Sequence, residues 1–169
     1  MAKNDLYHRI SIDTTIAELE RTLREKPWPD SSTDFGMHLD RVRFNTGLRL
    51  DKISRFEEKI GQRFPDDYKA FLQRSNGAFV FGVRLYSLQA SQNNSYTLEH
   101  KPFRYAHGEG IREARDVYTI ADWGTGDDIL LNLQVPAGAK NKNRRDVIDR
   151  FHEDDECRVI AKSFGEFLY

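Results

Sequence analysis

Cysteine is almost absent from this sequence, since Cys157 is the only one among 169 residues. A disulfide within the chain is therefore impossible, and a zinc site built from several cysteines is excluded. A chain without disulfides fits a reducing compartment, so we expect a cytoplasmic protein. Cys157 falls in an expected strand and is most simply interpreted as a small core residue.

Long apolar runs and an excess of charge of one sign are also missing. No stretch reaches the ~18 apolar residues expected of a membrane helix, and residues 1–20 contain no apolar run of signal-peptide length. The 26 Lys and Arg against 27 Asp and Glu give a formal net charge of −1. This balance lacks the basic excess of a general nucleic-acid-binding protein. We therefore expect neither a membrane nor a nucleic acid as a direct partner.

The apolar content is nevertheless sufficient for one folded domain. Hydrophobic residues make up 38% and aromatic residues 12% of a length that suits a single domain, 1–169. Apolar residues at helical spacing predict three helices before the first strand. These are a helix of about 15–25 with a capping box of Thr15 and Glu18, a helix capped by Asp51 and closed by Gly61, and a helix that runs from Pro65 to Asn76-Gly77.

The second half of the chain is dominated by expected strands. They are "AFVFGVRLYSL" with a bend at Gly82, "DVYTIAD", "DDILLNLQV", "DVIDRF" and "CRVIA". Residues 30–49 suggest a short helix or an irregular segment, and 89–110 a long loop or a ragged hairpin. A last helix should start at Ser163, which has capping-box spacing to Glu166. Helices, then strands, then a closing helix indicate an α+β fold with a mostly antiparallel sheet.

The stretch "RFPDDYKAFLQRSNGAF" places two adjacent carboxylates, Asp66 and Asp67, behind a proline. A catalytic pair needs two carboxylates that converge on one bond. Adjacent residues in the first turn of a helix point about 100° apart and converge poorly. Acidic residues are favoured there by the free amides and the helix dipole. We therefore interpret Asp66 and Asp67 as a helix start and not as an active site.

Two acidic turns between strands are the stronger candidates for a site. The first is "DWGTGDD", where we expect Gly124 and Gly126 to supply the positive φ angles of a hairpin turn, and the second is "HEDDE". An aromatic residue on an exposed turn is a plausible anchor for a protein contact. The candidate partner-binding residues on these turns are Trp123, Asp127, Asp128, Glu153, Asp154 and Asp155.

Catalytic and metal sites find less support. His152 with its neighbouring carboxylates could ligate a metal, but a zinc site would want a second His or Cys at useful spacing. The serines lack a nucleophile elbow, and the five histidines fit no triad spacing. We expect no cofactor, no bound metal and no enzymatic activity.

Three segments together resemble the SUKH superfamily, in the branch of the yeast cell-wall assembly regulator and bacterial immunity proteins. They are "ISRFEEKIGQRFPDDYKAFLQRSNGAF", "IADWGTGDDILLNL" and "VIDRFHEDDECRVIAKSFGEFL". In the first segment Phe64 stands where the family usually has Leu. The matching positions there are Glu57, Gly61, Pro65, Tyr68, Phe71, Leu72, Asn76 and Gly77, followed by Gly126-Asp127 and Ser163-Phe164 in the other two.

The resemblance covers 50–169 and leaves 1–49 as an N-terminal helical extension. It implies helices packed around a twisted sheet and a non-enzymatic protein-binding domain. The first hypothesis is an immunity protein that neutralises a cognate polymorphic toxin domain, often a nuclease. The alternatives are a regulatory or signalling interaction module and, from another class, a small metal-dependent hydrolase that uses His152.

Overall fold

The computed structural model describes residues 12–25, 42–89, 97–98, 103–107, 110–114, 116–135, 137–138 and 145–168. The helices in these ranges are α2 (Ile12–Glu25), α3 (Leu50–Ile60), α4 (Asp66–Arg74) and α5 (Phe164–Leu168). The strands are β1 (Val42–Phe44), β2 (Ala78–Val80), β3 (Val83–Leu85), β4 (Phe103–His107), β5 (Gly110–Ala114), β6 (Val117–Asp122), β7 (Asp128–Asn132), β8 (Val147–Arg150) and β9 (Cys157–Ala161).

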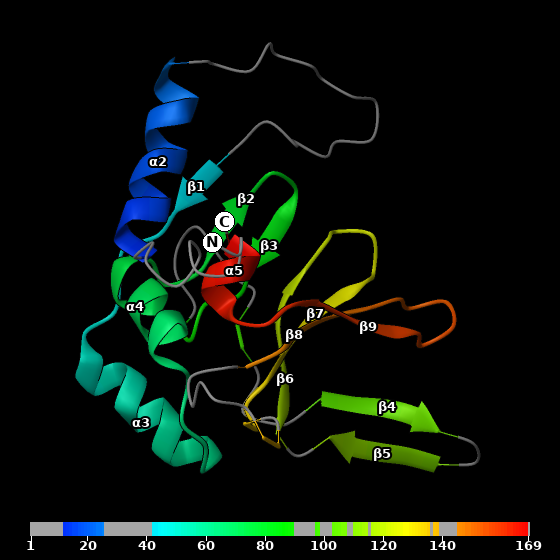
Figure 1. Ribbon diagram of the computed structural model, residues 1–169. Helices are drawn as coiled ribbons and strands as arrows, with labels where there is room; N and C mark the ends of the chain where they lie inside the picture. The colour runs from blue at the N-terminus through cyan, green and yellow to red at the C-terminus, as the bar shows by residue number, and fades with distance from the viewer. Residues whose placement is uncertain are drawn as a thin grey trace.

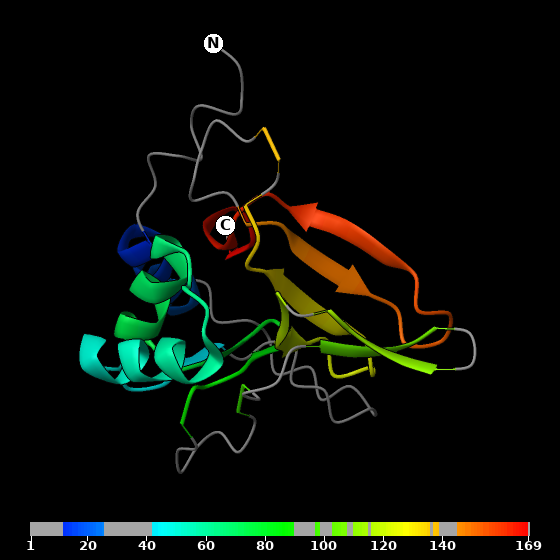
Figure 2. The same cartoon turned by 90° about the horizontal axis from the view of Figure 1, so that it is seen from below.

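The sheet confirms the expected α+β class. Seven strands pair in the order β1-β2-β3-β6-β7-β8-β9, and every neighbouring pair among them is antiparallel. β4 and β5 form a separate antiparallel hairpin, so a hairpin occupies the end of the stretch 89–110 and continues beyond it. Figures 1 and 2 show α2, α3 and α4 together on one side, with α5 between them and the sheet.

Aromatic rings join the helices to the closing helix α5. Phe164 is fully buried, and its ring centroid lies 4.8 Å from that of Tyr68 and 5.0 Å from that of Phe71. The expected buried face of α4, which consists of Tyr68, Phe71 and Leu72, is confirmed. Burying an aromatic side chain of this size contributes about 1.5–3 kcal/mol. This cluster therefore fixes the C-terminal helix against the N-terminal ones.

The helix-start interpretation of Asp66 and Asp67 is also confirmed. Pro65 is the N-cap of α4, and both carboxylates lie in its first turn. Asp67 accepts hydrogen bonds from the backbone N–H of Tyr68 and, at 2.8 Å, from that of Gly165 in α5. Burial raises the pKa of the Asp67 carboxyl, while these backbone hydrogen bonds oppose the shift. Asp67 thus has a structural role, since it links α4 to α5.

Two other predictions, the helix stop at Gly61 and the capping box at Ser163, are also confirmed. Gly61 closes α3 in the left-handed conformation at φ 69°. Ser163 Oγ accepts the backbone N–H of Glu166, and the Glu166 carboxylate accepts the N–H of Lys162. In a usual capping box the glutamate would accept the N–H of the cap residue Ser163 itself, but here it accepts that of the preceding residue, Lys162. Two free amides are satisfied, as predicted.

Two helix starts were predicted wrongly. α2 includes Ile12, four residues before Ile16 on the same buried face, so Thr15 lies inside the helix and is not its N-cap. α3 begins at Leu50 after Arg49, and Asp51 lies in its first turn without capping it. The Asp51 carboxylate instead accepts a hydrogen bond from the Arg49 side chain at 3.0 Å.

Two strand predictions and one burial prediction were also wrong. The expected bent strand at 78–88 is a hairpin, because Phe81 and Gly82 both have positive φ, 48° and 89°. For residues 30–49 we predicted a short helix or an irregular segment, but Val42–Phe44 form the short strand β1, which pairs with β2. The strand expected at "CRVIA" is present as β9, but Cys157 is exposed and not a core residue, because β9 is the last strand of the sheet.

Candidate functional site

The β6–β7 turn and the β8–β9 turn lie at the same end of the sheet. β6, β7, β8 and β9 are consecutive antiparallel neighbours, so alternate turns return to one end. At this end, the register aligns Asp122 with Asp128, Asp128 with Arg150, and Arg150 with Cys157. Directly opposite residues share a face of an antiparallel pair. The fold therefore gathers the candidate residues from two distant stretches of sequence.

Arg150 joins the two turns through opposite charges. Its Nη1 donates to Asp128 Oδ2 at 2.8 Å, and its Nε donates to Asp155 Oδ1 at 2.9 Å. The Arg150 side chain is only 17% exposed. Burial raises the pKa of the Asp128 carboxyl, and the adjacent guanidinium opposes that shift. We call Arg150 with these two carboxylates the Arg150 clamp.

A second link connects His152 to Asp127. His152 Nδ1 lies 2.7 Å from Asp127 Oδ1, and the backbone N–H of His152 donates to the same oxygen at 3.1 Å. Thr125 Oγ1 donates to the other carboxylate oxygen at 2.9 Å. Gly126 has φ +107°, and a Cβ there would lie 3.2 Å from His152 Nδ1. A side chain at Gly126 would thus crowd the imidazole as well as strain the turn.

The His152–Asp127 link should be strongest in mildly acidic solution. Their hydrogen bond raises the pKa of His152 and lowers that of Asp127. The histidine contribution is present below its unfolded pKa of about 6.5 and is lost as the pH rises through the raised value. The aspartate contribution is present above its unfolded pKa of about 3.9 and is lost as the pH falls through the lowered value.

Trp123 is half-buried and already has a partner within the domain. Its indole Nε1 donates to Asp149 Oδ1 at 2.8 Å, and the side chain packs against the core. Arg158 donates to the other oxygen of Asp149 from Nε and Nη2, at 3.1 and 3.0 Å. The Arg158 guanidinium also lies 5.0 Å from the Phe151 ring centroid. Trp123 is therefore held rigidly, with part of its ring left at the surface.

Three carboxylates of the β8–β9 turn face solvent on this fixed frame. Glu153, Asp154 and Glu156 are exposed. Asp154 accepts the backbone N–H of Glu156 at 2.9 Å. Neither glutamate side chain forms a hydrogen bond or ion pair with the described part of the chain. We call the two turns, 123–128 and 151–156, the acidic edge.

All six candidate residues lie on the acidic edge, but they differ in availability. Three of them, Asp127, Asp128 and Asp155, are paired with His152 or Arg150 within the domain. Glu153 and Asp154 are exposed to solvent. The sequence did not identify Arg150, Asp149 or Glu156 as members of this site. Arg150 is 22 positions from Asp128, and only the strand register shows that they meet. Glu156 alone carried a readable signal, since it belongs to the same acidic run.

The described ranges contain neither a cluster of metal ligands nor a membrane-spanning helix. No three His, Cys, Asp or Glu side chains there are grouped so that they could hold a metal ion. Among the helices of those ranges, none has the length and apolar character needed to cross a membrane. The arrangement at the acidic edge offers ion pairs and exposed carboxylates, which suit recognition of a positively charged surface.

The model of the SMI1 / KNR4 family (SUKH-1) matches residues 47–169. The chain belongs to the SUKH-1 family. The SUKH-1 match runs from the segment before α3 to the end of the chain and includes the whole acidic edge. The family supports a protein-interaction domain, in agreement with the prediction of a binding protein. A comparison with curated proteins found no significant match.

Proposed function

We propose that this SUKH-1 domain is an immunity protein that binds and neutralises a cognate toxin domain through its acidic edge. The observation that carries the proposal is a set of outward carboxylates, Glu153, Asp154 and Glu156, on turns that are cross-linked internally. The proposed contacts also include Trp123, Asp127, Asp128 and Asp155.

Rigidity supports a binding role for this edge. The Arg150 clamp and the His152–Asp127 link restrain both turns before any partner arrives. A pre-organised surface loses less conformational entropy on association, which costs about 0.5–1.5 kcal/mol for each side chain that must be immobilised. The outward carboxylates can therefore bind with little reorganisation.

The charge of the edge indicates the chemistry of the partner. Carboxylates complement Lys and Arg, and such complementarity accelerates encounter and suppresses wrong partners. A nuclease toxin must itself be basic where it binds phosphates. An acidic protein edge placed over that surface would exclude the nucleic acid. This supports a nuclease as the toxin, in keeping with the family resemblance.

Co-expression tests the proposal. If a toxin gene lies beside this gene, its toxin domain is expressed in a host with wild-type protein, with the double variant Glu153→Lys/Asp154→Lys, or with the control Glu58→Lys. Glu58 is an exposed residue of α3, outside the acidic edge. We expect rescue of growth by the wild type and by the control, and loss of rescue with the double variant. Growth arrest that the wild-type protein does not relieve would contradict the immunity function.

The genomic neighbourhood separates this function from the second candidate. An interaction module in signalling could use the same acidic edge with a different partner. A neighbourhood without any polymorphic toxin gene would favour that module. A toxin gene whose product binds the purified domain would favour the immunity protein.

A further inference from the structure

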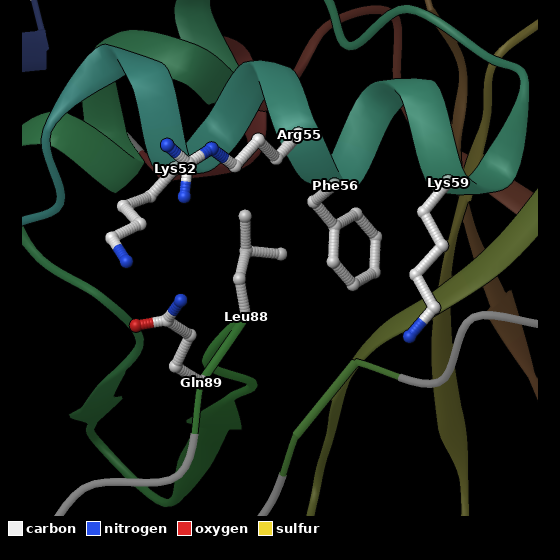
Figure 3. A pocket seen from close by; sticks show the side chains of 6 residues that line it. All are labelled: Lys52, Arg55, Phe56, Lys59, Leu88 and Gln89. Carbon is white, nitrogen blue, oxygen red and sulfur yellow. The ribbon is translucent and has the colours of Figure 1, made fainter.

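A basic pocket lies on the helical side of the molecule, away from the acidic edge. Figure 3 shows Lys52, Arg55 and Lys59 of α3 around a floor that includes Phe56 and Leu88. The pocket has a volume of about 240 Å³. The three cations recur at helical spacing, so they line one face of α3. In Figures 1 and 2, α3 and the β8–β9 turn lie at opposite sides of the molecule.

The wall of this pocket is fixed by a buried asparagine. Asn76 is 5% exposed, and both the oxygen and the nitrogen of its side-chain amide form hydrogen bonds with the backbone of the segment that follows β3. Its Oδ1 accepts the N–H of Leu88 at 2.8 Å, and its Nδ2 donates to the carbonyl of Gln89 at 3.0 Å. Leu88 and Phe56 are themselves 7% and 8% exposed. The apolar floor is therefore formed in advance and not created by a ligand.

The charges of the pocket lack compensation within the described ranges. Neither Lys52 nor Lys59 has an ion pair there, and Arg55 lies 3.9 Å from Asp51, an exposed contact of little energetic value. Like charges gathered on one helix face disfavour each other. An anionic ligand would relieve that repulsion.

The size of the pocket favours a single side chain as the buried part of a ligand. Sites for whole small molecules usually measure roughly 300–1,000 Å³, whereas this pocket measures about 240 Å³ and has room for one apolar side chain. Lys52 and Lys59 are seven residues apart, or about 10 Å along the helix axis. In an extended segment, side chains two positions apart share a face, and four residues span about 13 Å. Carboxylates two positions before and two positions after an apolar residue would thus lie on its face, and the flexible lysine side chains can reach both.

We propose that this pocket binds an acidic segment of a partner protein, with one apolar side chain on the Phe56–Leu88 floor and flanking carboxylates on Lys52 and Lys59. The inference goes beyond the immunity function. It assigns a second interaction surface whose charge is opposite to that of the acidic edge. One domain could then hold two different partners, or two regions of one partner, at the same time.

A displayed library of random twelve-residue peptides tests the proposal. Selection is run against the wild type, against Lys52→Glu/Lys59→Glu, and against the control Lys162→Glu, an exposed cation before α5. Circular dichroism melts establish that all three proteins fold. The most enriched peptide is then titrated by fluorescence anisotropy, beside versions with Gln for its acids and Ser for its apolar residue.

Enrichment of peptides with an apolar residue between acids, on the wild type and the control alone, is the expected result. The double variant and the glutamine peptide should each bind at least ~10-fold more weakly, and 500 mM salt should weaken binding by screening. Equal enrichment on the double variant, or enriched peptides without acids, would overturn the proposal. So would displacement by an equal concentration of inorganic phosphate, or self-association of the wild type that the double variant loses.

Discussion

Replacement of Arg150 by Met should destabilise the domain, most strongly at neutral pH. Methionine keeps much of the apolar stem and removes the charge. Breaking a fully buried ion pair costs 3–5 kcal/mol. Asp128 and Asp155 are 24% and 38% exposed, so water screens part of the charge left behind. We therefore expect a loss of about 1.5–3 kcal/mol in the free energy of unfolding at pH 7.

The pH dependence of that loss follows from Asp128. Burial already raises its folded pKa, and removal of the guanidinium removes the opposing effect. A carboxyl whose folded pKa is raised destabilises the fold when it is ionised, and this penalty vanishes below the unfolded pKa of about 3.9. The difference between Arg150→Met and the wild type should therefore shrink as the pH falls from 7 toward 4.

Urea denaturation at several pH values measures both effects. Arg43→Met is the control, because Arg43 is an exposed strand residue, and it should change stability by less than about 0.5 kcal/mol. Two results would refute the reasoning: equal losses for both variants at pH 7, or a loss for Arg150→Met that stays constant down to pH 4.

Three other perturbations probe the framework. Glu57 is 2% exposed and accepts a backbone N–H at 2.7 Å where the chain approaches α4. In urea unfolding, Glu57→Ala should therefore lower the free energy of unfolding by about 2–3 kcal/mol, and Glu57→Gln by less than half of that. Equal losses for the two variants would contradict this role. In NMR titrations the pKa of His152 should lie above 6.5 and fall in Asp127→Asn, whereas an unchanged pKa would show that the pair does not form in solution. A Cβ on Gly47 would lie 1.8 Å from a backbone oxygen of α4, while a Cβ on Gly61, at φ +69°, would meet open space. Gly47→Ala should therefore lower the melting temperature far more than Gly61→Ala, which should cost about 1 kcal/mol of stability. Similar melting temperatures for the two variants would show that the backbone around Gly47 relaxes.

Local signals predicted the existence of the helices better than their ends. Pro65 is the N-cap of α4 as expected, while the helix ends at Arg74 with Ser75 as its C-cap, one residue before the predicted stop at Asn76-Gly77. The hairpin after β2 escaped prediction because its first turn residue is Phe81, and a bulky side chain at positive φ is rare. Cys157 was misplaced because an edge strand and a central strand have similar composition, so burial depends on sheet order.

The acidic edge was predictable only in part. Its exposed carboxylates could be recognised as charged turns from the sequence alone. The Arg150 clamp could not be recognised in this way, because Arg150 and Asp128 are 22 positions apart in the sequence and meet only through the register of β7 and β8. The basic pocket likewise depends on Asn76 bringing Leu88 beneath α3, a contact between elements that no local pattern encodes.

Hydrogen exchange of the complex with the toxin domain tests the role of the acidic edge most directly. Binding there should slow amide exchange in peptides that cover 123–128 and 151–156, and should leave α3 unchanged unless an acidic segment also occupies the basic pocket. The double variant Glu153→Lys/Asp154→Lys should lose this protection. Protection confined to other surfaces, with both turns exchanging as fast as in the free protein, would contradict the assignment of the acidic edge as the toxin-binding surface.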